Sequence, residues 1–240
     1  MSRIILLVFL VFVGAGLIGA CGPRQFTTLT IYDTPTAYVH LEFHPTVKQG
    51  SEHSHPISLT SEQVAAVLGG VRIDEPFTLV RGGIPQWDPV PGLHPAFTDT
   101  EIAFFAPLLA LALSKATPEE IVTFYETRYL SAGTGREVTS GAMFVQGDAL
   151  HLILANYWSN IYHRYDFVTA DTQDDRRTPM QSLARQFGHF DFEPHSAKWE
   201  RPAGGFERLF QRDHRELVIL YKQLPPRPLI EPAPQPLAVP

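Results

Sequence analysis

The sequence predicts an α+β protein, a mainly antiparallel sheet packed with two or three helices in a single domain. Three observations lead to this prediction. Several segments alternate apolar and polar residues, as half-buried strands do. Other segments begin with the side-chain pattern of a capped helix. The two kinds of segment are interspersed without a repeating strand–helix unit, which disfavours a parallel sheet.

The expected strands are short. Residues 27–32 are rich in β-branched side chains, and residues 37–44 alternate apolar and polar after a turn at 33–36. Residues 142–145 and 150–158 flank a turn that contains Gly147, which indicates a hairpin. Further strands are expected at 161–168 and 216–221.

Three helices are expected from their start signals. Thr60 with Gln63 forms a capping box, and that helix is expected to end at Gly69 and Gly70. Thr98 with Glu101 forms a second capping box before a long apolar run, in which Pro107 predicts a kink or a break. The sequence Thr-Pro-Glu-Glu at 117–120 predicts a third helix, to about residue 128. A weak helix is expected at 180–186.

Composition limits the function. The chain has 240 residues and a formal net charge of −6, with no block of basic residues. Nucleic acid is therefore an unsuitable partner, because binding its phosphates requires clustered Lys and Arg. Cys21 is the only cysteine, which excludes an internal disulfide and a structural zinc site of several thiolates.

The N-terminus has the pattern of an export signal. Arg3 precedes an apolar run at residues 4–13, which is too short for a membrane span of about 20 residues. Small residues come next, and the segment ends Leu-Ile-Gly-Ala-Cys at 17–21. This ending resembles the lipobox of bacterial lipoproteins. An ordinary signal peptide, or an anchor that extends past Cys21, is the alternative.

The resemblance implies cleavage before Cys21, a diacylglyceryl group on its sulfur and acylation of the new amine. The expected organisation is a signal peptide at 1–20, a globular domain at 21–223 and a proline-rich extended tail at 224–240. The tail is either a disordered end or a ligand for an envelope partner. Gly22 stands where an aspartate resembles an inner-membrane retention signal, so the outer membrane is favoured in a cell with two membranes.

Five residues form a candidate metal site. On the expected strand, His40, Glu42 and His44 point to one side, and His53 and His55 lie in the next loop. Imidazoles with a carboxylate are ligands that zinc or copper accepts. The same alternation is typical of the polar face of an edge strand, and the spacing matches no known closed site.

A second cluster lies at 189–195, where His189, Asp191 and Glu193 alternate with Phe190 and Phe192. A half-buried strand with a wet outer face has the same pattern. The sequence contains no nucleophile elbow, P-loop or dinucleotide fingerprint. We therefore expect a lipid-anchored, non-enzymatic binding or assembly component of the cell envelope. A zinc- or copper-binding lipoprotein is the alternative, and an envelope hydrolase using Asp191 and Glu193 is the third hypothesis.

Overall fold

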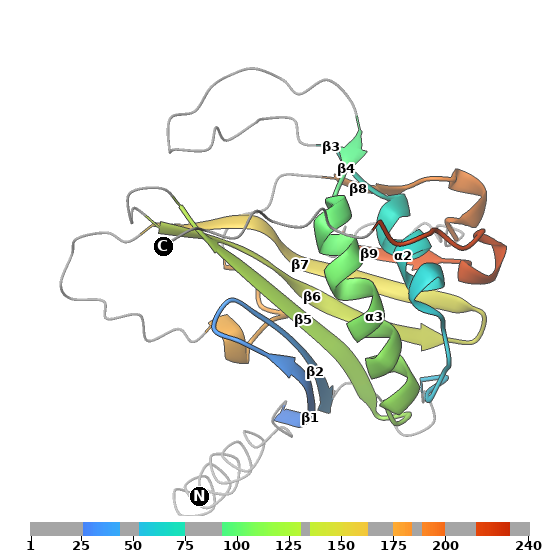
Figure 1. Ribbon diagram of the computed structural model, residues 1–240, viewed down its shortest axis with the longest axis horizontal. Helices are drawn as coiled ribbons and strands as arrows, with labels where there is room; N and C mark the ends of the chain where they lie inside the picture. The colour runs from blue at the N-terminus through green and yellow to red at the C-terminus, as the bar shows by residue number, and fades with distance from the viewer. Residues whose placement is uncertain are drawn as a thin grey trace, which may run out of the picture.

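The computed structural model describes residues 26–43, 53–74, 93–130, 135–162, 175–183, 189–199 and 215–230. A six-stranded antiparallel sheet, in the order β1-β2-β5-β6-β7-β9, lies beside a three-stranded sheet, β4-β3-β8 (Figure 1). With two helices in the described residues, this confirms the α+β class. The elements are β1 (Phe26–Asp33), β2 (Ala37–Phe43), α2 (Ser61–Gly70), β3 (Val71–Asp74), β4 (His94–Pro95), α3 (Asp99–Lys115), β5 (Glu120–Tyr129), β6 (Gly135–Gln146), β7 (Ala149–Tyr162), β8 (His189–Phe192) and β9 (Glu216–Ile219), with short 3₁₀ turns at Asp175–Arg177, His195–Ala197 and Tyr221–Gln223.

Both helices cover the same face of the large sheet (Figure 1). The buried side chains of α3 recur every three or four residues, so they form one stripe along the helix. This stripe packs on apolar residues of β2, β5, β6 and β7 in a single hydrophobic core. The large, fully buried members of this core include Phe105, Leu109, Leu113, Phe124, Met143 and Leu150. No helix in the described residues is long and apolar enough to cross a membrane.

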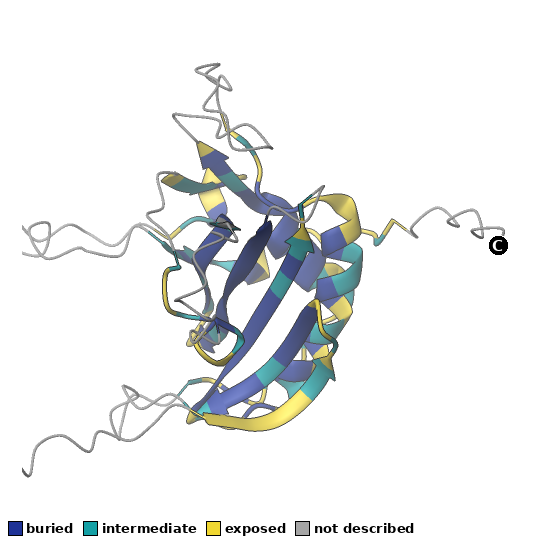
Figure 2. Ribbon diagram, turned by 90° about the vertical axis from the view of Figure 1, so that its left-hand side faces the viewer, coloured by how far each residue is buried: buried dark blue, intermediate teal, exposed yellow. Residues whose placement is uncertain are grey.

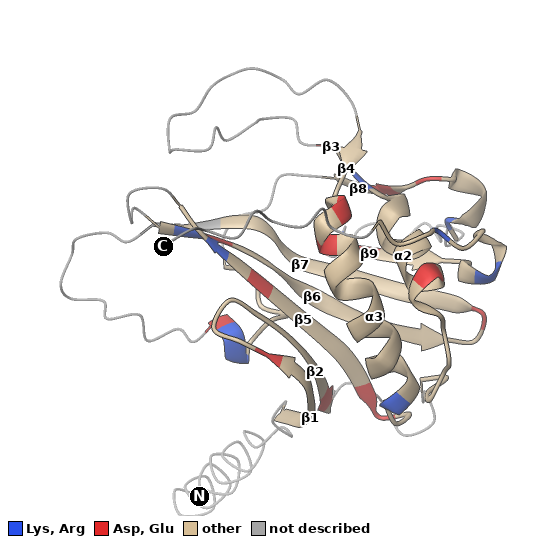
Figure 3. Cartoon of the chain, in the orientation of Figure 1, with Lys and Arg blue, Asp and Glu red and all other residues tan. Residues whose placement is uncertain are grey.

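The two predicted capping boxes are confirmed. In α3 the amide of Glu101 donates to Thr98 Oγ1 at 3.2 Å, and the amide of Thr98 donates to Glu101 Oε2 at 2.6 Å. Thr60 and Gln63 make the same reciprocal pair at the start of α2. Acidic residues lie in the first turn of α3 and Lys115 in its last turn, as the helix dipole favours (Figure 3).

The expected break at Pro107 does not occur, because α3 is continuous from Asp99 to Lys115. Pro107 is on the exposed side of the helix, where water can solvate the carbonyl that loses its amide partner. Leu111 is also exposed, so one side of α3 faces solvent although residues 102–113 are apolar throughout.

The third predicted helix is wrong, because Glu120–Tyr129 is strand β5. Its start signal does form a local turn, in which the amide of Thr117 donates to Glu120 Oε2 at 2.8 Å. The helix does not propagate. The residues after the turn are β-branched or aromatic, and they pair with β2 on one side and β6 on the other.

The other strand predictions are confirmed in outline. β1, β2 and the β6–β7 hairpin lie where they were expected, and Gly147 adopts φ 61° in the hairpin turn. β7 extends to Tyr162, and the rest of the strand expected at 161–168 lies outside the described residues. Residues 180–183 form no helix, and 184–186 also lie outside.

The two edges of the large sheet differ. The outer side of β9 is covered by residues 197–199, because the amide of Trp199 donates to Val218 O at 2.8 Å and that of Leu220 to Ala197 O at 2.7 Å. Strand β1 at the other edge is exposed over its first five residues and is the lowest strand in Figure 2.

Part of the proline-rich segment packs on the domain. Residues 224–230 contain no helix or strand, and the amide of Arg227 donates to Glu62 O at 3.0 Å. The Arg227 guanidinium pairs with Asp99 at 2.7 Å and fills the space beside Gly69. Residues 231–240 lie outside the described residues.

Gly141 provides a test of the packing between β6 and β7. A Cβ at this position would lie 1.9 Å from the backbone oxygen of Ile153 and 3.1 Å from Phe124 Cζ. We expect Gly141→Ala to lower the free energy of unfolding by about 3 kcal/mol, because the backbone itself must move. Gly147→Ala, which meets no atom but has positive φ, is expected to cost about 1 kcal/mol. Urea denaturation measures both, and equal losses would contradict this account.

Candidate functional site

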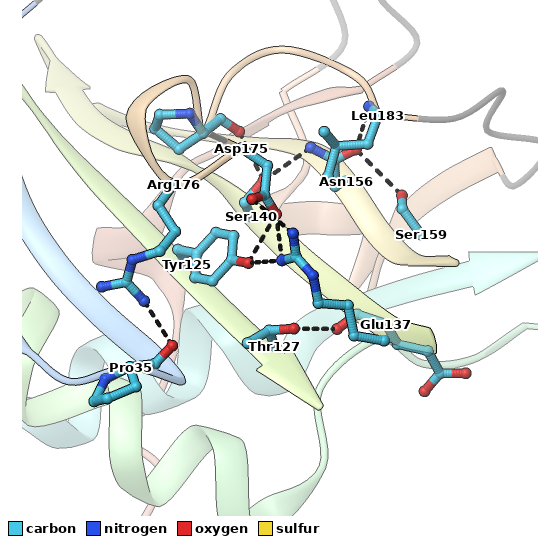
Figure 4. Close-up of polar contacts among 12 residues, drawn as sticks. Pro35, Tyr125, Thr127, Glu137, Ser140, Asn156, Ser159, Asp175, Arg176 and Leu183 are labelled. Carbon is cyan, nitrogen blue, oxygen red and sulfur yellow. Dashed lines mark hydrogen bonds and ion pairs between the residues drawn. The ribbon is translucent and has the colours of Figure 1, made fainter. Parts of the chain in front are cut away.

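The face of the large sheet opposite the helices carries a cluster of polar and aromatic side chains, which we call the latch (Figure 4). It joins strands β2, β5, β6 and β7 to the segment 175–183. The latch consists of Tyr38, Tyr125, Arg136, Ser140, Asn156, Asp175 and Arg176.

The centre of the latch is a buried ion pair. Arg136 Nη1 and Nη2 donate to the two carboxylate oxygens of Asp175 at 2.6 and 2.9 Å. The hydroxyl of Tyr125 donates to Asp175 Oδ2 at 2.8 Å and accepts from Arg136 Nη1 at 2.6 Å. All three residues are buried. Both oxygens of this carboxylate therefore accept hydrogen bonds from side chains of the protein itself, two from the guanidinium and one from the phenol.

Arg176 extends the latch toward β1. Its guanidinium carbon lies 5.2 and 5.4 Å from the ring centroids of Tyr38 and Tyr125, which are themselves stacked. Arg176 Nη2 donates to Asp33 Oδ1 at 2.5 Å, and the hydroxyl of Tyr38 donates to Arg176 O at 2.6 Å. Burial raises the pKa of both tyrosines, so both phenols stay protonated.

The other end of the latch is held by two small polar residues. The Ser140 hydroxyl donates to Pro179 O at 2.7 Å and accepts from Asn156 Nδ2 at 2.9 Å. Asn156 also accepts from the amide of Leu183 at 2.8 Å. Because these bonds satisfy backbone groups of the segment 175–183, they hold that segment on the sheet.

A second polar group lies at the N-terminus of α3. Arg128 donates to Glu101 Oε1 and lies 3.7 Å from Glu126, and its guanidinium carbon lies 5.7 Å from the ring centroid of Trp158. Trp158 has φ 43°, an uncommon value for a residue other than glycine. Burial, together with the smaller effect of the charge of Glu101, raises the pKa of Glu126 to about 7.

Four of the five predicted metal ligands lie in the described part of the chain, where they do not gather into one group. His40 and Glu42 share the latch face of β2 as expected. His40 stacks on Tyr38 and lies 3.5 Å from Asp33, and Glu42 accepts from Thr123 Oγ1 at 2.8 Å. Burial lowers the pKa of His40.

The two loop histidines lie beside the C-terminal end of β6, at Phe144 and Val145. His55 Nε2 accepts from the amide of Val145 and its Nδ1 lies 3.1 Å from Glu120 O, so a neutral ring with hydrogen on Nδ1 satisfies both contacts. Burial lowers the pKa of His55. His53 packs on Phe144. His44 lies outside the described residues, among which no three His, Cys, Asp or Glu side chains form a group that could hold a metal.

The second cluster forms strand β8, as predicted. Its carboxylates are in ion pairs: Asp191 with Lys198 at 2.7 Å and Glu193 with Arg72 at 2.6 Å. Phe192 is buried and His189 is exposed, which matches the expected alternation. The two carboxylates therefore have separate cationic partners, and Asp191 also lies 3.6 Å from His195 Nδ1, whose side chain is exposed.

Arg136, Asp175 and Arg176 belong to no motif that would mark them in the sequence. Asp175 and Arg176 belong to a run of charges that is typical of a solvated loop when its partner is unknown. The one local indication of the latch is the pair of opposite charges at 175–176.

Comparison of the chain with protein-family models, with curated proteins and with solved structures finds no match.

The latch predicts a large effect of Asp175→Asn. The change leaves the buried Arg136 guanidinium without a charged partner, so we expect a loss of about 3 kcal/mol in the free energy of unfolding. Asp148→Asn breaks an exposed ion pair with Lys222 and should cost less than about 1 kcal/mol. Urea denaturation compares the two. A similar small loss for both variants would show that the latch contributes little.

Glu126 predicts a pH dependence of stability. Its folded pKa of about 7 exceeds the ordinary value of 4.5, so its stabilising contribution is full below pH 4.5 and is lost as pH rises through 7. Glu126→Gln should therefore unfold like the parent protein at pH 4 and be about 1–2 kcal/mol more stable at pH 8. Thermal unfolding across this range tests it, with Glu119→Gln, at an exposed site, as control. A difference that is constant with pH would contradict the assignment.

Proposed function

We propose that the protein is a bacterial lipoprotein, anchored through Cys21, that acts as a binding or assembly component of the cell envelope. The observation that carries the proposal is the N-terminal sequence. A basic residue, a short apolar run and the ending Leu-Ile-Gly-Ala-Cys stand in the order that export and lipidation require. The only cysteine of the chain is at the position that the lipid would occupy.

The start of the folded domain fits an anchor at Cys21. Strand β1 begins at Phe26, so only residues 22–25 separate it from the lipidated cysteine. At full extension the chain from Cys21 to Phe26 covers at most about 17 Å. Such an anchor keeps the β1 edge of the large sheet near the membrane surface. Gly22 favours the outer membrane in a cell with two membranes.

The polar groups on the sheet support binding rather than chemistry. In the latch, the carboxylate of Asp175 and the hydroxyl of Ser140 are engaged in hydrogen bonds within the protein. The carboxylates of Asp191 and Glu193, in and just after β8, are ion-paired in the same way. A domain whose polar side chains fix its own segments presents a preformed surface, which suits a partner protein.

Cys21→Ser tests the anchor. We expect the full chain, expressed in a bacterium fed an alkyne-tagged fatty acid, to carry the tag, and the Cys21→Ser form to lose it and keep its signal peptide. Mass spectrometry of the N-terminal peptide and fluorescence of the clicked tag measure both.

Gly22→Asp is the matched control, because it retains the cysteine. It should keep the fatty acid and, in a cell with two membranes, move to the inner membrane on a density gradient. A parent chain without the tag, or a Cys21→Ser form that retains it, would refute the proposed anchor.

A further inference from the structure

We propose that two copies of the protein associate through their β1 strands, which pair antiparallel and join the two large sheets into one. The inference goes beyond the proposed function and rests on it only for the effect of the lipid anchor on local concentration. Strand β1 forms an open edge of the large sheet. An edge strand presents unpaired backbone donors and acceptors, which another strand can satisfy.

The exposed side chains of β1 are apolar or hydroxylated. Phe26 is 57% exposed and Leu29 is 43% exposed, and Asp33 at the end of the strand is its only charged residue. Lysine, glutamate and proline, which commonly protect an open edge, are absent from β1. The opposite edge, β9, is covered by residues 197–199. The chain therefore covers the outer side of β9, whereas residues 26–32 of β1 carry no charged side chain and no proline.

The sequence of β1 identifies the partner as a second copy. An antiparallel pair with two-fold symmetry needs a strand that is complementary to itself when reversed. Residues 26–32 read Phe-Thr-Thr-Leu-Thr-Ile-Tyr, which is nearly the same from either end with Leu29 at the centre. A two-fold axis at Leu29 places like beside like: Leu29 opposite Leu29, Thr28 opposite Thr30, Thr27 opposite Ile31 and Phe26 opposite Tyr32. Aromatic, Thr–Thr and β-branched pairs of this kind stabilise neighbouring strands.

The register of β1 with β2 limits how much of this edge can pair. The pairing shifts between Thr27 and Leu29 and again between Thr30 and Tyr32. Leu29 and Thr30 thus form the regular stretch between two irregularities, and the irregularities shorten the edge that can pair. A short pairing is weak in dilute solution. A lipid anchor that confines both copies to one surface raises their effective concentration, which compensates for the weakness.

The bilayer itself is a poorer partner for this edge. Its apolar interior cannot satisfy the free backbone groups of β1, and each such group costs free energy when it is removed from water. Residues 26–33 also contain no Lys or Arg to contact anionic headgroups. A second β1 strand satisfies the backbone groups and buries the apolar side chains at the same time.

Disulfide crosslinking tests the pairing. Because lipidation consumes the sulfur of Cys21, a cysteine introduced by Leu29→Cys is the only free thiol in the full chain. The full-length variant is expressed with the fatty-acid tag, its membranes are treated with a mild oxidant, and the disulfide-linked dimer is measured on a non-reducing gel. Two Leu29→Cys residues on the two-fold axis are within the Cα separation of a disulfide.

Thr27→Cys is the matched control on the same exposed strand. In the proposed register its two copies are offset by about 13 Å along the strands, which is beyond disulfide reach. We expect about tenfold more linked dimer from Leu29→Cys than from Thr27→Cys. Equal crosslinking of the two variants, or none from Leu29→Cys, would overturn the proposal.

If another protein or the bilayer covers the β1 edge instead, the crosslinking experiment gives a different result. Either result overturns the proposed pairing. A disulfide-linked band of another mass identifies another protein at the edge. A Leu29→Cys thiol that forms no disulfide but is shielded from a membrane-impermeant maleimide places β1 on the bilayer. The fatty-acid tag in the same sample reports the anchor separately. A tagged chain without linked dimer refutes the pairing alone, whereas an untagged chain refutes the proposed function.

Discussion

The pairing of Arg136 with Asp175 determines how the second face of the large sheet is covered. Helices α2 and α3 bury the other face with ordinary apolar packing, which tolerates small shifts. The latch face has no α-helix in the described residues, and its strands carry tyrosines, threonines and an arginine. Its cover is the segment 175–183, and one carboxylate joins that segment to both Arg136 and Tyr125.

Directional hydrogen bonds fix the position of the segment 175–183 on the sheet. Ser140 and Asn156 bind backbone groups at positions 179, 181 and 183, so the whole segment has one register on the sheet. A buried ion pair adds little net free energy over an apolar contact, but it penalises any arrangement that separates the charges. We infer that the latch specifies a position for the segment more than it contributes to stability.

The sequence was sufficient where local rules decide the structure. Both capping boxes, the hairpin at Gly147 and the alternation in β2 and β8 are determined by neighbouring residues. Thr117 shows the limit of such rules. Its start signal forms the turn that it encodes, and the strand partners on both sides of β5 then determine that residues 120–129 are extended. Strand pairing is decided by distant residues, so a local signal cannot predict it.

The candidate site was less accessible to sequence reasoning. The histidines at 40, 53 and 55 were predicted as metal ligands because imidazole commonly binds metals. In the structure His40 stacks on Tyr38, whereas His55 accepts a hydrogen bond from the amide of Val145. The latch depends on a pair 39 positions apart, and no spacing rule connects them. Only the pairing of β5 with β6 brings Tyr125 and Arg136 to one face.

The different protection of the two sheet edges sets the size that an assembly can reach. Edge-to-edge growth into a fibre requires each subunit to offer two free edges, as in cross-β stacking. Here Trp199 and its neighbours occupy the outer side of β9, which pairs with residues 150–153 of β7, so that this strand offers no free edge to another strand. The proposed pair, joined at β1, therefore cannot grow further through β9, which limits the polymerisation that two open edges would allow.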